Sequence, residues 1–450
     1  MAEEVRTGQP PGVTSPAFAH VRKVVVSSTI GTALEVYDFI VYGLAAALVF
    51  DKIFFPGLPP ALGTLLSFAS FAVGFVMRPV GAIVLGHFGD KYGRRRVLIV
   101  TITGMGLATG AIGLIPPAAS IGYLAPLLLV FLRLVQGFSI GGEWSGATTM
   151  VLEHAPPEKR SRLQMCVQLG SPIGSLAATG AFAALGGLST AQLLSWGWRI
   201  PFLISFLVVL FALYMRLKVA ESPVFEQARE EARLAKVPVV AMLKTSWVAL
   251  VAAVLIVQLD LGGYYLVSTY LTNYATATAG ATRSVVLTAL AIGTVLQAGA
   301  IIVVGFLGDR YRPVTVLFVA ILVAAVVPFP MFALVNTGNP TLVTLGIVLG
   351  VAILPAQFGV LGMVVARLFG DDVRYTGLSI AYNVGAMTGG LMPTISVAVQ
   401  SASGSSTGIV VLMLGLAALS VCGVLLGRMV IARTAGRAGF GMTAPAEQPG

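Results

Sequence analysis

The segment GHFGDKYGRRR, from Gly86 to Arg96, indicates how the chain is organised because a related segment occurs later in the sequence. The later stretch is GFLGDRYRPVT, from Gly305 to Thr315, and its glycine, acid, base and tyrosine match the first at a constant spacing of 219 residues. Asp90 of the first stretch thus corresponds to Asp309 of the second. One such loop arises easily by chance, but two at equivalent places predict that the chain consists of two related halves.

Composition places these halves in a membrane. Of the 450 residues, 57% are hydrophobic and only 10% are charged, whereas an ordinary soluble domain has roughly 25% charged residues. The mean hydropathy is +0.91. A soluble protein this apolar could not cover its surface with polar groups, so we expect an all-α integral membrane protein.

Spanning helices need about 20 mostly apolar residues, and the sequence contains twelve such segments. A weaker repeat, at a spacing of 215 residues, links the fifth segment to the eleventh through Gln168, Gly170 and Gly174 and their counterparts Asn383, Gly385 and Gly389. The fold class expected is therefore twelve transmembrane helices in two pseudo-symmetric halves of six. The predicted spans are 27–50, 62–86, 97–115, 122–146, 164–186, 197–216, 246–272, 284–306, 314–335, 341–366, 376–398 and 407–429.

Basic residues orient the spans. With both termini in the cytoplasm, 23 of the 28 Lys and Arg residues fall in cytoplasmic segments, as the positive-inside rule requires. We expect a multi-pass protein of the cell membrane, in which a charged surface helix joins the halves. The predicted segments are a cytoplasmic N-terminal tail (1–26), a first half (27–216), a cytoplasmic linker (217–245), a second half (246–429) and a cytoplasmic C-terminal tail (430–450).

Other function classes find little support in the sequence. The two cysteines lie inside apolar runs without the spacing of a disulfide framework or a metal site. The net charge of +10 comes from short loops between apolar spans, so we expect a lipid bilayer and not nucleic acid as the partner of these bases. A Walker loop and a nucleophile–base pair are both missing, which argues against an ATP-driven pump and an enzyme. We expect no cofactor beyond protons as the coupling ion.

Several motifs resemble those of a known family. GxxxD(R/K)xGR(R/K) is the signature loop of the major facilitator superfamily, and here it is GHFGDKYGRR at 86–95. The stretches GTALEVYDFIVYG (31–43), RLVQGFSIGGEW (133–144) and SWGWRIPFL (195–203) are similar to the metabolite:proton symporter family, which includes transporters of shikimate, α-ketoglutarate, citrate and proline/betaine. AAALVFDKIFFP (45–56) resembles the shikimate-type branch most. Val36 departs from the aromatic residue usual in the family, and the second-half loop has lost part of the motif.

Ionisable residues inside the predicted spans are candidate transport residues, because each costs roughly 2.5–3.5 kcal/mol on insertion scales. Glu35 and Asp38 lie three residues apart in the first span, and Arg133 lies near the middle of the fourth. The simple interpretation is a carboxylate–arginine cluster that faces a central cavity, binds an anionic substrate and couples it to protons. Gln136, one turn from Arg133, is a further candidate. A purely structural ion pair and helix packing are the alternatives.

Three more residues lie within spans. Asp260 in the seventh span is the one acid predicted near the midplane of the second half, with Tyr264 one turn away. The two residues predict a second proton or substrate site, against the alternative of a hydrogen-bonded structural acid. Arg78 in the second span is expected to act in a gate or to stabilise the structure.

The signature loop predicts a cytoplasmic gate. By resemblance, the loop latches the two halves together when the protein faces outward, with Asp90 near the start of the eleventh helix and Arg94 paired with Glu143 at the end of the fourth. The alternative is simple positive-inside anchoring. The candidate gate residues are Gly86, Asp90, Gly93, Arg94 and Glu143 in the first half and Asp309 and Arg310 in the second.

The sequence therefore predicts a proton-coupled symporter that imports a small polar organic acid by alternating access and functions as a monomer. Uptake of a zwitterion such as betaine or proline is the main alternative, because a fixed arginine suits both. A proton-coupled exporter is a further alternative, although LEVYDF and SWGWRIPFL argue against it. A nontransporting receptor on the same fold would be expected to lose the charges inside the spans.

Overall fold

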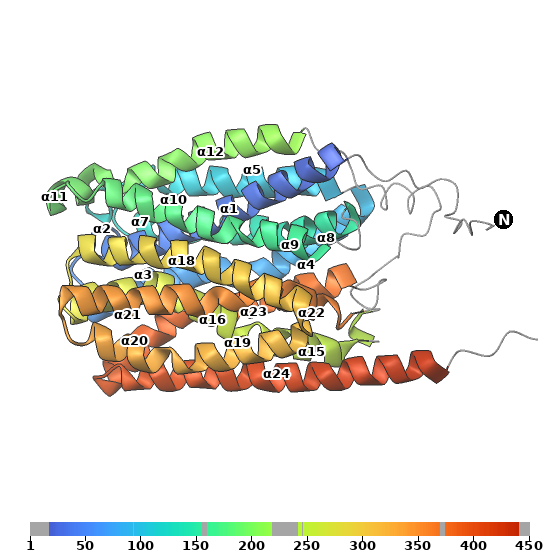
Figure 1. The fold of residues 1–450 in the computed structure, drawn as a ribbon. Coiled ribbons are helices and arrows are strands. Elements are labelled where there is room, and N and C mark those ends of the chain that lie inside the picture. The colour runs from blue at the N-terminus through green and yellow to red at the C-terminus, as the bar shows by residue number, and fades with distance from the viewer. Residues whose placement is uncertain are drawn as a thin grey trace, which may run out of the picture.

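The structure is a computed structural model that describes residues 18–92, 94–154, 160–217, 242–244, 246–369 and 374–440. These residues form a bundle of long helices that run roughly parallel or antiparallel to one another (Figure 1). The first helix begins and the last helix ends at the same end of the bundle, which we call the terminal end (Figure 1).

Nine helical stretches among the described residues are long and apolar enough to cross a membrane, and Arg96–Ile112 is a shorter apolar helix. The two remaining predicted spans, the fifth and the eleventh, are also helical, over Arg160–Ala184 with one turn residue between two helices and over Arg374–Ser403. Each of these two carries buried polar residues, such as Gln168 and Asn383, which lower its hydropathy. All twelve predicted spans thus coincide with helices.

The first half contains both continuous spanning helices and spanning helices that are interrupted by a break. Its long elements pack around α1, which contacts α3, α8, α9, α10 and α12. The elements are α1 (Phe18–Leu48), α2 (Phe50–Ile53), α3 (Pro60–Val76), α4 (Arg78–Tyr92), α5 (Arg94–Ile112), α6 (Ala118–Ile121), α7 (Leu124–Ile140), α8 (Glu143–His154), α9 (Arg160–Gln168), α10 (Gly170–Ala184), α11 (Thr190–Gln192), a π-helical turn (Leu193–Gly197) and α12 (Arg199–Leu217).

The second half is interrupted more often. Proline explains two of the breaks, at Pro328 and at Pro355, since proline removes a backbone donor and clashes with the preceding turn. Its elements are α15 (Trp247–Ile256), α16 (Gln258–Tyr265), π-helical turns Leu266–Tyr270 and Tyr274–Thr278 around α17 (Leu271–Asn273), α18 (Arg283–Arg310), α19 (Pro313–Val326), α20 (Pro328–Val335), α21 (Pro340–Ile353), a 3-10 turn (Leu354–Gln357), α22 (Phe358–Ala366), α23 (Arg374–Ser403) and α24 (Thr407–Phe440).

The weaker sequence repeat corresponds to the same packing in both halves. A Cβ on Gly174 of α10 would lie 2.1 Å from the carbonyl oxygen of Ala33 in α1. A Cβ on Gly389 of α23 would lie 2.9 Å from the backbone of Leu261 in α16. In each half, therefore, glycine lets the fifth spanning helix approach the first.

Two predicted ends differ from the structure. The first helix begins at Phe18, within the predicted tail 1–26, and Val21 and Val24 are buried in a small core cluster that extends the helix. The last helix continues to Phe440, beyond the predicted span end at 429. Most of the predicted linker 217–245 and its charged surface helix lies outside the described residues.

Candidate functional site

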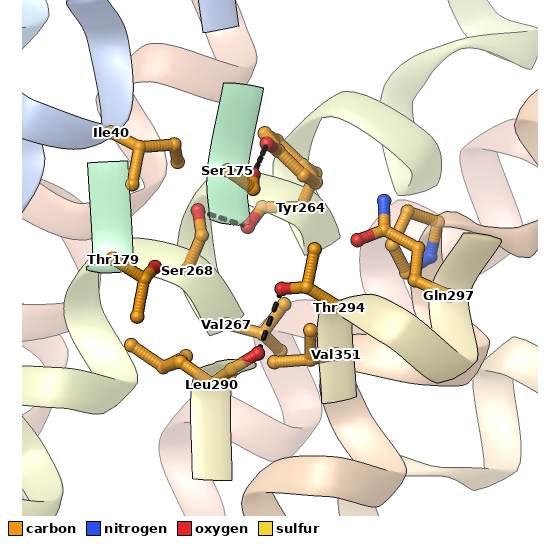
Figure 2. A pocket seen from close by; sticks show the side chains of 11 residues that line it. Ile40, Ser175, Thr179, Tyr264, Val267, Ser268, Leu290, Thr294, Gln297 and Val351 are labelled. Carbon is orange, nitrogen blue, oxygen red and sulfur yellow. Dashed lines mark hydrogen bonds between the residues drawn. The ribbon is translucent and has the colours of Figure 1, made fainter. Parts of the chain in front are cut away.

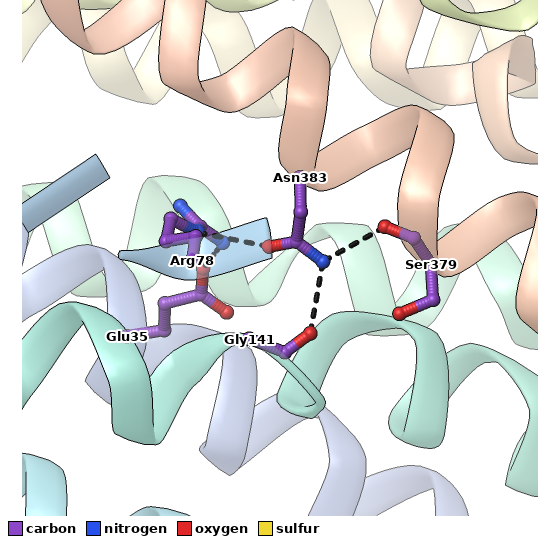
Figure 3. A network of polar contacts seen from close by, with 5 residues as sticks. All are labelled: Glu35, Arg78, Gly141, Ser379 and Asn383. Carbon is purple, nitrogen blue, oxygen red and sulfur yellow. Dashed lines mark hydrogen bonds and ion pairs between the residues drawn. The ribbon is translucent and has the colours of Figure 1, made fainter. Parts of the chain in front are cut away.

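A buried charge network lies where the two halves meet (Figure 3). Arg78 Nη2, at the start of α4, forms an ion pair of 2.5 Å with Glu35 Oε1 of α1. Arg78 Nε donates across the interface to Asn383 Oδ1 of α23 at 3.1 Å. Asn383 Nδ2 in turn donates to the carbonyl oxygens of Gly141, at 2.8 Å, and of Ser379, at 2.9 Å. The network therefore joins three elements of the first half to one helix of the second.

Glycine makes this network possible at the crossing of α4 with the break between α7 and α8. A Cβ on Gly141 would lie 2.2 Å from the backbone nitrogen of Ala82, and one on Gly81 would lie 2.0 Å from the carbonyl oxygen of Phe138. Because α7 ends at Ile140, the carbonyl of Gly141 is free of the helix ladder and can accept the bond from α23.

A second polar network lies inside the first half. Ser205 Oγ donates to Asp38 Oδ1 at 2.9 Å, and Thr109 Oγ1 donates to Asp38 Oδ2 at 2.7 Å. Gln136 Nε2 donates to Thr109 Oγ1 at 2.7 Å, and Gln136 Oε1 accepts a bond from Arg133 Nη1. Asp38 is thus linked to Arg133 through two intervening side chains.

The single carboxylate–arginine cluster expected from the sequence is therefore two separate networks. Glu35 pairs with Arg78 and not with Arg133, and Asp38 contacts neither arginine directly. Three residues of helix turn the chain through about 300°, so the two acids point about 60° apart. That difference directs Glu35 toward α4 and the other half, and Asp38 toward α5 and α12.

Aromatic rings surround Arg133. Its guanidinium carbon lies 4.2 Å from the ring centre of Tyr42, 4.7 Å from that of Phe39 and 4.9 Å from that of Phe71. Gly74 leaves room for it, because a Cβ there would lie 2.7 Å from Arg133 Nε. In this conformation Arg133 is completely buried within the first half, behind rings that face the interface.

The aromatic layer continues into the second half through Tyr265. Its ring centre lies 4.8 Å from that of Phe75 and 5.7 Å from that of Phe71. Arg78 lies over Phe75 as well, at 5.6 Å. The two arginines are therefore separated by a shared set of rings.

Asp260 and Tyr264 are both buried in α16 of the second half. Tyr264 Oη shares a hydrogen bond of 2.7 Å with Ser175 Oγ of α10, which joins the halves. Neither carboxyl oxygen of Asp260 has a hydrogen-bond partner among the described residues, and its side chain is completely buried. The structure thus places the predicted pair near the interface but gives only the tyrosine a partner.

A narrow pocket lies beside Tyr264 between the halves (Figure 2). Its cavity volume in this conformation is about 10 Å³, close to the minimum that a single water molecule needs. Its lining comes from α1 and α10 of the first half and, in the second half, from α16, α18, α21, the π-helical turn Leu266–Tyr270 and the 3-10 turn Leu354–Gln357. The lining residues are Ile40, Ser175, Thr179, Tyr264, Val267, Ser268, Leu290, Thr294, Gln297, Val351 and Pro355.

Contacts between the halves occur on both sides of this pocket. Toward the terminal end, Trp144 stacks on Tyr382 with ring centres 4.0 Å apart and planes inclined by 7°. Toward the opposite end, Asn273 Nδ2 lies 3.4 Å from the carbonyl oxygen of Ala47. The conformation therefore holds the halves together at both ends.

The candidate gate is only partly described. Gly93 and the side chains of Asp90 and Arg94 lie outside the described residues, and so does the predicted pairing of Arg94 with Glu143. Gly86 lies within α4. Glu143 is buried at the start of α8 and accepts a hydrogen bond of 2.9 Å from Thr101 Oγ1. Asp309 and Arg310 are exposed at the end of α18.

Sequence reasoning missed several residues of these networks. Thr109, Ser205 and Gln297 belong to no motif and stand in mostly apolar spans, so only their contacts identify them. Asn383 was visible as a member of the weaker repeat, but its bond to Arg78 joins spans 305 residues apart. Arg78 was expected in a gate or structural role and lies at the centre of the interface.

Comparisons with known proteins agree with the architecture. A model of the Major Facilitator Superfamily matches residues 39–393. A crystal structure of a D-xylose-proton symporter has a TM-score of 0.71 to this fold and 18% sequence identity, covering 91% of this chain and 97% of that one. At that identity the likeness concerns the fold alone.

Curated relatives are much more similar in sequence. The inner membrane metabolite transport protein YhjE of Escherichia coli strain K12 is 39% identical over 373 residues, covering 82% of this chain and 85% of the relative. The shikimate transporter of the same strain is 37% identical over 378 residues (83% and 86%), and its proline/betaine transporter is 32% identical over 391 residues (83% and 77%). These relatives are membrane transporters and not enzymes. The chain therefore belongs to the major facilitator superfamily and, within it, to the metabolite:H+ symporter family.

Proposed function

We propose that this transporter imports a small organic acid together with protons, by alternating access between its two halves. The terminal end faces the cytoplasm in this proposal, in keeping with the distribution of basic residues. The observation that supports this proposal is a set of buried ionisable side chains with unpartnered polar atoms. The two arginines belong to the first half, and the aspartate belongs to the second.

The cationic part consists of Arg78 and Arg133. Within the described part of the chain, Arg78 Nη1 and Arg133 Nη2 are buried and have no hydrogen-bond partner. A buried unsatisfied donor costs about 1–3 kcal/mol, and more when it is charged. A carboxylate can fill such donors with strong, short bonds, so an organic anion fits the space next to them.

Arg78 is the better placed of the two for first contact with substrate. Its bond to Asn383 and its position 5.7 Å from the ring of Tyr382 put it at the boundary with the second half. Arg133 lies behind the rings of Phe39 and Phe71 in this conformation. A movement of those rings would open Arg133 to the cavity, and its link through Gln136 would pass the change on to Asp38.

The acidic part is Asp260. A carboxylate buried without a counter-ion or hydrogen bonds is expensive, and a bound proton removes its charge. Opening of the cavity to water would let Asp260 release that proton. A proton that moves through 100 mV supplies about 2.3 kcal/mol, enough for roughly fifty-fold accumulation of substrate.

A zwitterion is the second candidate substrate. The proline/betaine transporter is a relative of this chain, and the ring cluster of Phe39, Phe71, Phe75 and Tyr265 offers faces to a quaternary ammonium group. A betaine could place its carboxylate on an arginine and its ammonium on these rings.

Uptake into proteoliposomes distinguishes the candidates. Labelled shikimate, α-ketoglutarate, citrate and betaine are compared with and without an inward proton gradient, for the wild type, Asp260→Asn and Arg133→Lys. We expect one acid to accumulate only with the gradient, and both variants to lose accumulation. Arg199→Lys is the matched control, because Arg199 donates to the carbonyls of Gly113 and Ile115, away from the cavity. Gradient-driven uptake of betaine alone would overturn the organic acid.

A further inference from the structure

The pocket beside Tyr264 is rich in uncharged polar groups. Among its polar lining residues, Ser175 and Thr179 belong to α10 of the first half, and Ser268, Thr294 and Gln297 belong to the second. The apolar lining residues complete the walls (Figure 2). None of the residues that line the pocket carries an ionisable acid or base, apart from the phenol of Tyr264.

Gln297 is the group in this pocket that lacks partners. Its side chain is 1% exposed, and within the described ranges neither its amide oxygen nor its amide nitrogen has a hydrogen bond. The other polar groups are partly satisfied: Thr294 Oγ1 donates to Leu290 O at 2.7 Å, and Ser268 Oγ donates to Tyr264 O at 2.7 Å. In Figure 2 the amide of Gln297 lies on the side that faces Thr294 and Tyr264.

The amide oxygen and the amide nitrogen of Gln297 both lack a hydrogen-bond partner in a buried site. This points to a ligand group that can donate and accept hydrogen bonds. A hydroxyl group of the ligand has this property. It can also bond to the serine and threonine hydroxyls that line the pocket. A second carboxylate would find only neutral donors here and would lose most of its hydration. A quaternary ammonium group would find no carboxylate among the lining residues.

Two helices connect the pocket with the surroundings of Arg78. Ile40, which lines the pocket, follows Phe39, whose ring lies 5.2 Å from the guanidinium of Arg78. Tyr264 precedes Tyr265, which packs on Phe75 beside the same guanidinium. Helices α1 and α16 thus contribute side chains both to the pocket and to the rings around Arg78.

We propose that this pocket binds the hydroxyl groups of the substrate, so that the transported acid is a hydroxylated monocarboxylate. The inference rests on the proposed function and deepens it by naming the substrate class. The carboxylate binds at the arginines, and Gln297 exchanges two hydrogen bonds with hydroxyls at the far end of the molecule. The pocket opens with the separation of the halves, because both of them contribute to its walls.

Exchange across proteoliposomes tests the assignment without a proton gradient, so its result does not depend on what drives transport. Unlabelled compounds compete with labelled shikimate, a ring carboxylate with three hydroxyls. Cyclohexanecarboxylate lacks the hydroxyls, α-ketoglutarate supplies a second carboxylate, and betaine supplies the ammonium group. We expect shikimate to compete at least tenfold better than each of the others, because a site built to hydrogen-bond a hydroxyl discriminates strongly against an analogue without it.

Two variants link the preference to the pocket. Gln297→Leu keeps the side-chain volume and is expected to weaken competition by shikimate about tenfold or more, while cyclohexanecarboxylate competes equally well or better. Gln168→Leu is the matched control: Gln168 is also buried with both amide atoms unpartnered among the described residues, but it does not line the pocket. The preference for hydroxyls should survive in that variant.

The outcomes separate this inference from the proposed function. If shikimate and cyclohexanecarboxylate compete equally in the wild type, or if Gln297→Leu keeps the full preference, the pocket assignment is wrong, although acid transport can stand. If the preference is present but the acid never accumulates with a proton gradient, the pocket assignment stands and proton coupling fails. If labelled shikimate does not exchange at all, the pocket assignment is wrong, and uptake of the other labelled acids tests the proposed function separately.

Discussion

Replacing either partner of the ion pair between Glu35 and Arg78 should destabilise the protein strongly, whereas replacing both should not. Glu35→Leu leaves a buried guanidinium without its carboxylate. Removal of one partner of a buried pair costs about 3–5 kcal/mol, because the remaining charge keeps its desolvation penalty. Arg78→Met leaves the carboxylate and also removes the donor to Asn383, which adds roughly 1 kcal/mol.

The double variant carries neither charge. Its remaining cost is the lost bond to Asn383 and imperfect packing, about 1–2 kcal/mol. The two substitutions are therefore far from additive, as expected for residues 2.5 Å apart. The order of stability predicted is wild type, then the double variant, then Glu35→Leu, and Arg78→Met last.

Thermal unfolding of the purified protein, in detergent and again in lipid nanodiscs, measures that order directly. Arg199→Met is the matched control for loss of a guanidinium that donates to backbone carbonyls and lies over the ring of Trp198. It should lower the midpoint less than Arg78→Met. A Glu35→Leu midpoint equal to that of the wild type would show that the ion pair does not stabilise the fold. So would a double variant less stable than both single variants, since the two groups would then not be neutralising each other.

Three further predictions concern other parts of the networks. Asp38→Asn turns an acceptor of two hydroxyl bonds into a group that can accept only one well, so the unfolding midpoint should fall by the equivalent of about 1–3 kcal/mol; an unchanged midpoint would contradict the hydrogen bonds. Gly174→Ala should strongly reduce folded protein in size-exclusion chromatography, because its Cβ would lie 2.1 Å from a carbonyl oxygen of α1, whereas Gly180→Ala on the same helix meets no atom within 4 Å and should behave as wild type. Trp144→Ala removes the stack on Tyr382, so a cysteine placed in the cavity should react faster with a thiol reagent applied from the terminal end; equal rates would show that this stack does not hold the halves together.

The sequence predicted the class of fold well because the relevant signals are local and repeated. Apolar length identifies spans wherever a helix faces lipid, and the loops at Asp90 and Asp309 recur at a fixed spacing. The same method was least informative at helix ends, where the first helix begins at Phe18. Charged or polar residues there continue a helix once a small cluster such as that around Val21 and Val24 packs against it.

The candidate site was harder to predict because it depends on which face of a helix points where. The acids at 35 and 38 were correctly identified as buried charges, but their partners could not be read from spacing. About 60° of helix rotation separates a residue that meets Arg78 from one that meets Thr109 and Ser205. Contacts between spans far apart in the chain leave no periodic trace in a single sequence.

The same limit applies to the pocket. Gln297 stands among apolar residues of α18 and resembles any polar residue in a packed span until its lack of partners is known. The gate residues of the motif at 86–95 are the opposite case, because the motif identifies them from the sequence alone. Their predicted pairing stays a prediction, because the side chains of Asp90 and Arg94 lie outside the described residues.

Proton movement driven by substrate is the decisive measurement for proton-coupled import. Proteoliposomes that contain a pH-sensitive dye receive the organic acid outside, at equal pH on both sides and with the membrane potential clamped. We predict that the interior becomes more acidic as the acid enters, and that Asp260→Asn and protein-free liposomes show no such change above passive leak. Uptake of the acid without interior acidification, or acidification undiminished in Asp260→Asn, would contradict the account.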